Sequence, residues 1–238
     1  MPTQRRHAKE KGKKYRKTRK QMGREIANTI LPPHPLSPFI KKKVDDKYFL
    51  IISKKNYHLF NLDNIYIKCF LEKMLSILRV SFEREKEYHI SQGSYPPGYN
   101  HQLSTILSFI ENPNYMTGIA TDENLVPQSY LHIERKHNDY DKMWTVCTNP
   151  ESRGKGFSSF VISNSLKEQI AKKRKNILLE VYNDDVIHRR ENEPKQSHIM
   201  EHFRKHGFNE VLRTQLSPTT QSQLLSNNDE TKVMVIDL

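Results

Sequence analysis

The stretch DKMWTVCTNPESRGKGFSSF, residues 141–160, decides the fold of this 238-residue chain. Its first eight residues are rich in types that favour a pleated surface and predict a strand, which the Asn-Pro pair after them ends. Gly154 and Gly156 then lead into a segment that predicts a helix. A strand, a glycine turn and a helix N-terminus offer free N–H groups and positive partial charge, so the sequence predicts an anion site at residues 153–158.

Two common phosphate loops fit this stretch less well. A Walker A loop needs Ser or Thr directly after its Gly-Lys pair, but Lys155 is followed by Gly156. A dinucleotide fingerprint needs a third glycine where Ser159 stands, and it normally opens its domain within a parallel unit. Asp184, after the next predicted strand, keeps the dinucleotide alternative open.

A third loop matches better. Residues 153–158 resemble the acetyl-CoA loop of the GNAT superfamily of N-acetyltransferases, Arg/Gln-x-x-Gly-x-Gly/Ala, with matches at Arg153 and Gly156 and a departure at Ser158. Further on, the pair Gly207-Phe208 is similar to the family's pair that closes its fourth helix, and residues 177–181 resemble the strand between these motifs. The resemblance covers about residues 114–214.

The resemblance implies a fold of the α+β type within the α/β class. Its central sheet would be mixed and mostly antiparallel, flanked by helices, with strand 141–148 running parallel to strand 177–182 and splaying from it. Acetyl-CoA would be the co-substrate, with its diphosphate on the loop and its pantetheine arm on the backbone of residues 146–148. The implied cofactor-binding residues are Val146, Cys147, Thr148, Arg153, Gly154, Lys155, Gly156, Phe157 and Ser158.

One departure puts turnover in doubt. The family often has a Tyr four residues before the Gly-Phe pair, as the proposed acid for the leaving thiolate, and here that position is Phe203. Phe203 cannot donate a proton. The charged connection from Asn183 to Pro194 is also longer than the family's usual one. The general acid is therefore open: another group or water protonates the thiolate, or the chain binds the cofactor without turnover.

The best candidates for acid–base groups lie on the predicted strand 126–135, where Tyr130, His132 and Glu134 alternate onto one face. An amine must lose a proton before it attacks a thioester, so we predict His132 and Glu134 as catalytic residues. An ordinary polar sheet face explains the same pattern.

The N-terminal region has a different composition from the rest. Residues 1–24 hold 11 Lys/Arg and one Glu, whereas the remainder holds 28 Lys/Arg and 26 Asp/Glu, so the net charge of +12 lies almost entirely in this head. Four prolines follow between Pro32 and Pro38. We predict a disordered basic extension over 1–40 and one acetyltransferase-like domain over 41–238. Residues 5–24 suit a solvated tail, a nucleic-acid contact or a nuclear address.

Other features argue against alternative classes. Cys69 and Cys147 form neither a disulfide framework nor a zinc pattern, which is typical of a reducing compartment. No apolar run is long enough for a membrane span, so we expect a cytoplasmic or nuclear protein without membrane contact. His198, His202 and His206 share one helix face, but a polar surface explains them better than a metal site, and we predict no metal. Tyr95 and Tyr99 are candidates for the acceptor wall.

The remaining periodicity predicts the other elements. A helix over 62–87, capped by Asp63, and a loop over 215–230 are expected. The remaining predicted strands are 47–53, 115–120, 126–135, 209–214 and 232–237, and the remaining helices are 101–111, 156–175 and 196–206. The last strand is expected to return beside residues 208–213.

Together these features indicate an N-acetyltransferase that moves an acetyl group from acetyl-CoA directly to an amine acceptor, which the sequence does not identify. The alternative is a catalytically inactive module of the same fold that binds nucleic acid or a partner through its basic head.

Overall fold

The structure is a computed structural model that describes residues 34–93, 102–136, 140–172, 176–187, 193–224 and 230–238. It divides the chain into two units, residues 1–37 and 38–238, and the account below concerns the second. The predicted basic head, together with Tyr95 and Tyr99, lies outside the described residues. The functional division at residue 40 therefore stays a prediction.

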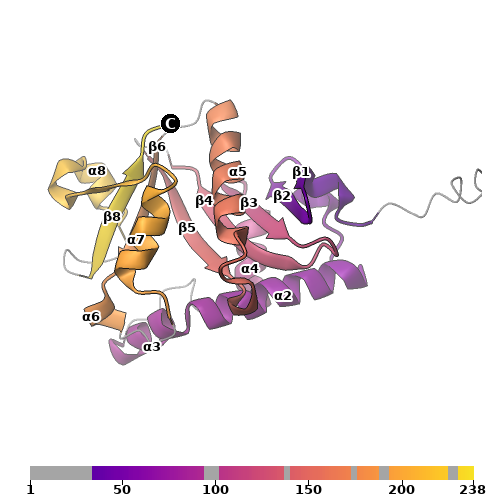
Figure 1. The fold of residues 1–238 in the computed structure, drawn as a ribbon, viewed down its shortest axis with the longest axis horizontal. Coiled ribbons are helices and arrows are strands. Elements are labelled where there is room, and N and C mark those ends of the chain that lie inside the picture. Colours follow the sequence, from indigo (N-terminus) through magenta and orange to yellow (C-terminus); the bar gives the residue numbers. More distant parts are fainter. Residues whose placement is uncertain (1–33, 94–101, 137–139, 173–175, 188–192, 225–229) are drawn as a thin grey trace, which may run out of the picture. The chain divides into compact units, whose positions relative to one another are not determined.

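An eight-stranded sheet in the order β1-β2-β3-β4-β5-β6-β8-β7 forms the body (Figure 1). Of the strand pairs in the described part of the chain, only β5–β6 is parallel. The strands are β1 (Ile40–Val44), β2 (Lys47–Ser53), β3 (Tyr115–Thr121), β4 (Pro127–Glu134), β5 (Tyr140–Thr148), β6 (Asn176–Tyr182), β7 (Asn209–Val211) and β8 (Thr231–Ile236). The predicted mixed, mostly antiparallel sheet is confirmed, and within it β3, β4 and β5 form an antiparallel meander. The last strand also returns beside residues 209–211 as predicted.

Helices cover both faces of this sheet. The α-helices are α2 (Ile65–Ser81), α3 (Glu83–Ser91), α4 (Leu103–Glu111), α5 (Phe157–Ala171), α6 (Asp184–Ile187), α7 (Gln196–Arg204) and α8 (Pro218–Gln221). Short 3-10 turns are η1 (Ser37–Phe39), η2 (Tyr57–Leu59), η4 (Pro150–Ser152) and η5 (Arg213–Gln215). Figure 1 shows α5 and α7 in front of the sheet and α2 beneath it. Among the described residues, no helix is both long and apolar enough to cross a membrane.

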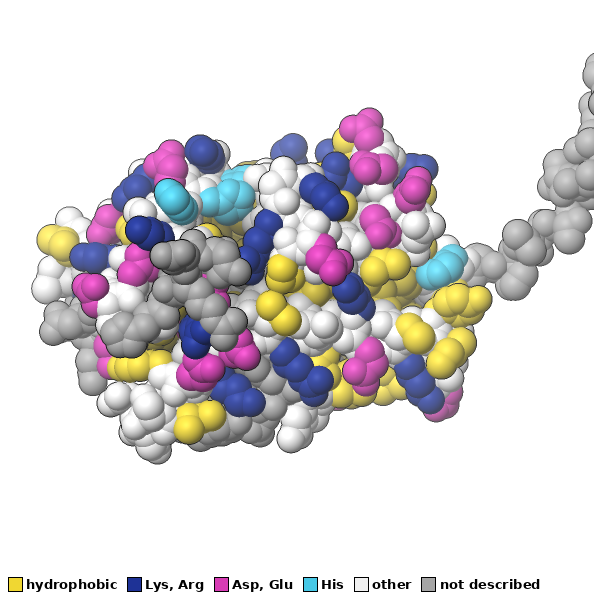
Figure 2. Space-filling model, turned by 60° about the horizontal axis from the view of Figure 1, so that its bottom comes forward, with side chains coloured by type: hydrophobic (Ala, Val, Ile, Leu, Met, Phe, Trp, Pro, Cys, Tyr) yellow, Lys and Arg dark blue, Asp and Glu magenta, His cyan; other side chains and the backbone are white. Residues whose placement is uncertain are grey.

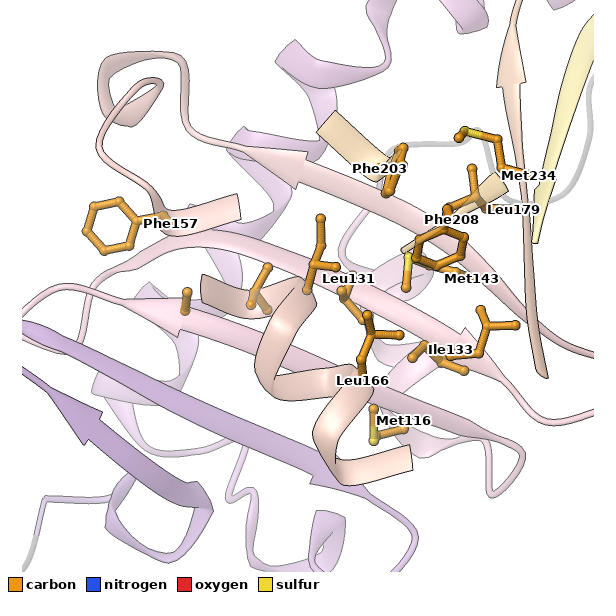
Figure 3. Close-up of a cluster of buried hydrophobic side chains, with 14 of the residues drawn as sticks. Met116, Leu131, Ile133, Met143, Phe157, Leu166, Leu179, Phe203, Phe208 and Met234 are labelled. Atoms are coloured by element: carbon orange, nitrogen blue, oxygen red, sulfur yellow. The ribbon is translucent and has the colours of Figure 1, made fainter. Parts of the chain in front are cut away.

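The main core lies between the sheet and the pair α5 and α7 (Figure 3). Leu131 and Ile133 point into it from β4, and Leu166 meets them from α5. Gly118 on β3 lets α5 come close, because a Cβ at that position would lie 2.3 Å from Ser165 Oγ. The close backbone approach that a glycine inside a strand suggests is therefore present.

Three predictions about local structure were wrong. The single helix over 62–87 is two helices, because the chain leaves helical geometry at Phe82 (φ −121°, ψ 23°). Asn64, not Asp63, caps α2, because its side-chain oxygen accepts the N–H of Tyr66 at 2.9 Å. The region 215–230 is not all loop, since α8 begins at Pro218 behind the Ser217 cap.

Charges on the body are mixed. Figure 2 shows Lys and Arg side chains interspersed with Asp and Glu over one whole face. This distribution agrees with the near-neutral count outside the basic head.

Candidate functional site

The centre of the candidate site is the place where β5 and β6 separate. The two parallel strands pair only at Tyr140–Asn176, Asp141–Ile177 and Lys142–Leu178. From Met143 to Thr148, β5 pairs with β4 on one side and, among the described residues, has no strand partner on the other. The predicted splay is therefore present, and one edge of β5 is left open toward the gap.

A β-bulge accompanies this separation. Leu131 of β4 pairs with Val146, but Ile133 pairs with Met143, so two residues of β5 stand opposite the single residue His132. Such a bulge bends its strand and increases the local twist. Because it begins directly after the last β5–β6 pair, it accounts for the turn of β5 away from β6.

The loop that follows β5 is fixed by a residue that the sequence did not suggest. Gln128, buried on β4, accepts hydrogen bonds at its side-chain oxygen from Asn149 Nδ2 at 3.0 Å and from Ser152 Oγ at 2.6 Å. Its own Nε2 donates to Asp122 Oδ2 at 2.8 Å. These contacts hold both ends of the η4 turn before the glycines, so the loop is positioned before any ligand arrives.

The glycines then turn the chain into α5. Gly154 (φ +78°) and Gly156 (φ +80°) both adopt left-handed geometry, and Gly156 caps the helix. The N–H groups of Arg153 and Lys155 are used inside the loop, bonding the carbonyls of Pro150 and Ser152. Those of residues 157–159, in the first turn of α5, have no carbonyl four residues back within the helix. An anion on this loop is therefore expected to accept hydrogen bonds from the backbone N–H groups of residues 157–159.

A cavity of about 810 Å³ joins the loop to the open edge of β5 and continues to α2, α3 and α7. Of the predicted cofactor-binding residues, it is lined by Val146, Cys147, Thr148, Arg153, Gly154, Gly156, Phe157 and Ser158. Lys155 does not line it. The lining also includes Phe82, Glu85, Phe109, Tyr115 and Trp144, none of which the sequence singled out.

The predicted catalytic residues do not line the cavity. His132 is completely buried, stacked on Phe109 with ring centroids 4.3 Å apart and bonded to Thr117 Oγ1 at 2.8 Å through Nδ1. Burial lowers the pKa of His132 to about 3, so the ring is neutral at physiological pH.

Glu134 reaches the cavity only through two neighbours. Its carboxylate accepts Trp144 Nε1–H at 2.6 Å. Burial, and then the negative charge of Glu134, raise the pKa of Tyr115 well above its usual value. A Lys136 ammonium 2.7 Å from the Glu134 carboxylate completes the cluster. The structure thus places a carboxylate directly behind two aromatic residues of the cavity wall.

Two of the three histidines, His202 on α7 and His206 just after it, contact serines of α5. Ser158 Oγ lies 2.9 Å from His202 Nε2, and Ser163 Oγ lies 3.2 Å from His206 Nδ1. Within the described residues, no group of His, Cys, Asp and Glu side chains could hold a metal ion. His198 and His202 line the cavity, together with Phe203.

Cys147 also lines the cavity but is buried, and burial raises the pKa of its thiol far above the usual value. A thiol in that state is a poor nucleophile. The Cys147 side chain therefore serves to pack β5 rather than to react.

No protein-family model and no curated protein matches the sequence. Solved structures do match the fold. An acetyltransferase from Streptococcus agalactiae aligns with a TM-score of 0.53 at 14% identity, covering 80% of this chain and 98% of that one.

A GNAT-family acetyltransferase from Staphylococcus aureus gives a TM-score of 0.52 at 14% identity, over 80% of this chain and 99% of that one. N-acetylglutamate synthase from Neisseria gonorrhoeae, solved with coenzyme A and N-acetyl-glutamate, gives 0.51 at 11% identity, over 82% of this chain but 36% of that one. The chain therefore has the fold of the GNAT acetyltransferases.

Proposed function

We propose that this chain is an N-acetyltransferase that transfers an acetyl group from acetyl-CoA directly to an amine acceptor. The observation that carries the proposal is that one cavity joins three features: the glycine loop, the open edge of β5 and an aromatic wall formed by Phe109, Tyr115 and Trp144. That order suits a phosphate, an extended amide chain and a reacting amine, in sequence.

The loop suits the diphosphate of the cofactor. The first N–H groups of α5 point out of the helix, and the helix dipole adds positive partial charge there. A Cβ built on Gly154 or Gly156 would meet nothing within 4 Å, so the space in front of the loop is open to a ligand. Arg153, which also lines the cavity, adds a full positive charge.

The open edge of β5 suits the pantetheine arm. Its amides would bond the unpaired N–H and C=O groups between Val146 and Thr148, as an added strand does. The same edge would orient the thioester and polarise its carbonyl through a backbone N–H. This mode of binding depends little on side-chain identity, which fits the low sequence identity to proteins of the same fold.

The amine would attack from the aromatic side, and its proton must leave. We assign Glu134 as the final proton acceptor, with Tyr115 between it and the cavity. The Tyr115 hydroxyl would gain the amine proton as it donates its own to the carboxylate. His132 fits this role less well than Glu134, because its ring is buried under Phe109 and resists protonation.

The leaving thiolate would take its proton from water, since Phe203 lines the cavity where a Tyr would supply one. Phe203→Tyr is therefore expected to increase turnover by about a hundredfold, the lower end of the usual range for a positioned acid, and to change cofactor affinity little. Release of free thiol from acetyl-CoA in the presence of a panel of amines measures this. An unchanged or lower rate in a folded variant would contradict the assignment of water as the acid.

The same Phe203 also favours a second candidate, a module that binds CoA without turnover and contacts nucleic acid through its basic head. The deciding experiment measures calorimetric binding of acetyl-CoA, amine-dependent thiol release and nucleic-acid binding for the full chain and for a chain without residues 1–24. An acetyltransferase binds acetyl-CoA and keeps thiol release after the deletion. Binding without release for every amine, together with salt-sensitive nucleic-acid binding lost on deletion, would support the module instead. A folded full chain that does not bind acetyl-CoA would refute the acetyltransferase proposal.

A further inference from the structure

A serine–histidine contact lies at the loop that the proposed function assigns to the cofactor diphosphate. Ser158 Oγ, in the first turn of α5, is 2.9 Å from Nε2 of His202 on α7, and both residues line the cavity. In the turn just after α7, His206 makes a similar contact with Ser163, and the rings of His202 and His206 lie 5.2 Å apart. The two contacts join α7 to α5 and fix the position of the His202 ring.

The surroundings of His202 favour its neutral form. Burial, and then the positive charge of Lys205, lower the pKa of its imidazole below the usual 6.5. The titratable and charged residues of the surrounding elements are His198, Glu201 and Arg204 on α7, Lys205 and His206 just after it, Glu193 and Lys195 ahead of it, Arg153 and Lys155 on the loop, Lys167 and Glu168 on α5, and Glu180 and Tyr182 on β6. In the neutral tautomer with its proton on Nδ1, the imidazole accepts the Ser158 O–H at Nε2.

A bound diphosphate would reverse this balance. Its two negative charges at the first turn of α5 would favour the imidazolium form. Once protonated, Nε2–H of His202 becomes the donor and Ser158 Oγ the acceptor. The Ser158 O–H is then free to turn and donate to a phosphate oxygen.

We propose that His202 is a cofactor-binding residue that takes up one proton from solvent when the diphosphate of CoA occupies the loop. Protonated His202 then donates to Ser158 Oγ, and the Ser158 O–H donates to a phosphate oxygen. The proposal rests on the proposed function, because it needs the cofactor at this loop. It also gives the hydroxyl of Ser158 a role at a position where the resembled motif has Gly or Ala.

The test is calorimetric titration of dephospho-CoA into the full chain at pH 6 and pH 8. Dephospho-CoA keeps the diphosphate but lacks the 3′-phosphate, whose own titration in this range would obscure the result. Repeating each titration in two buffers with different ionisation enthalpies counts the protons taken up. Because the pKa of free His202 lies below 6.5, a rise of about two units on binding corresponds to about tenfold tighter binding at pH 6 than at pH 8.

Three variants locate the effect. His202→Gln keeps an amide that can bond Ser158 but cannot titrate, and Ser158→Ala removes the hydroxyl; both are expected to lose most of the tenfold pH dependence. His198→Gln, on the same helix and the same cavity wall, is the matched control and is expected to keep it. NMR titration of the wild-type histidine rings, with and without dephospho-CoA, gives the same answer without requiring that a variant fold.

The outcomes are distinguishable. Binding that is equal at both pH values, or a pH dependence that survives in His202→Gln, overturns the proposal while leaving the acetyltransferase proposal intact. A pH dependence that survives in Ser158→Ala overturns the part assigned to the hydroxyl. No binding of dephospho-CoA or acetyl-CoA by the folded chain overturns this inference and the proposed function together.

Discussion

Replacing Gly156 by Glu perturbs the proposed cofactor loop at the residue that caps α5. Gly156 has φ +80°, and a Cβ there would meet nothing within 4 Å, so the cost to the free protein is backbone strain alone. Left-handed geometry costs an L-residue about 1–2 kcal/mol. For a domain of this size, 1 kcal/mol shifts the melting temperature by about 2–4 °C, so we expect a loss of roughly 2–8 °C.

The effect on binding should be larger than the effect on stability. The new carboxylate would lie beside the diphosphate, where two like charges repel by about 1 kcal/mol at 4 Å in water and about 4 kcal/mol at a partly shielded surface. An intermediate value near 3 kcal/mol corresponds to about a hundredfold weaker binding. Calorimetric titration of acetyl-CoA and thermal unfolding of the same samples measure the two effects separately.

Gly93→Glu provides the matched control. Gly93 also has left-handed geometry (φ +64°), a Cβ there would also meet nothing within 4 Å, and the residue does not line the cavity. We expect a similar loss of melting temperature and unchanged affinity for acetyl-CoA. If Gly156→Glu binds acetyl-CoA as tightly as the wild type, or if both variants lose affinity equally, the assignment of the diphosphate to this loop is wrong.

Three further predictions concern stability. Burial lowers the pKa of His132 to about 3, so the folded protein loses stability as the pH falls from 6.5 toward 3. At pH 4 the expected loss in the free energy of unfolding is about 3 kcal/mol. Urea unfolding at pH 7 and pH 4 measures this loss, which should be much smaller in His132→Asn than in the wild type. Gly118→Ala should lower the free energy of unfolding by about 2 kcal/mol, because the new Cβ would lie 2.3 Å from Ser165 Oγ. Adding Ser165→Ala to the same chain should restore most of this stability, and a double variant no more stable than Gly118→Ala would show that the clash lies elsewhere. Lys142→Met removes the ammonium 2.7 Å from the Glu180 carboxylate, which keeps the Arg213 guanidinium at 3.2 Å, so the expected cost in urea unfolding is about 2 kcal/mol. The double variant with Glu180→Gln should recover part of this cost, and equal costs for the single and double variants would contradict the coupling.

Local chemistry explains what the sequence predicted well. Gly154 and Gly156 stand between a strand-forming and a helix-forming segment, and this order alone predicts the turn into α5. The hairpin connections of the meander have short polar turns, so antiparallel pairing follows from turn length. These signals depend on residues adjacent in the chain, and the structure keeps all of them.

Contacts between distant segments explain what the sequence did not predict. The edge strand β1 is mostly exposed and has Lys at three successive positions, so it shows no apolar alternation. The buried pair of Lys142 and Glu180 joins strands whose charged residues read as solvent-facing. The contact of Gln128 with the loop and that of His202 with Ser158 each join segments more than 20 residues apart, which no periodicity reveals.

The bulge in β5 has a consequence for how this site can change during evolution. Between the pairs Leu131–Val146 and Ile133–Met143, β5 has one residue more than β4. We attribute the cleft beside β6 to this extra backbone residue and not to any particular side chain. Point substitutions there can alter what touches a ligand, yet they leave the extra backbone residue in place. Loss of one codon at position 144 or 145 would do the opposite: it would even out the two strands, allow β5 to close onto β6, and erase the cleft in one step. Along this segment, lineages are therefore expected to tolerate varied residue types while keeping the length constant.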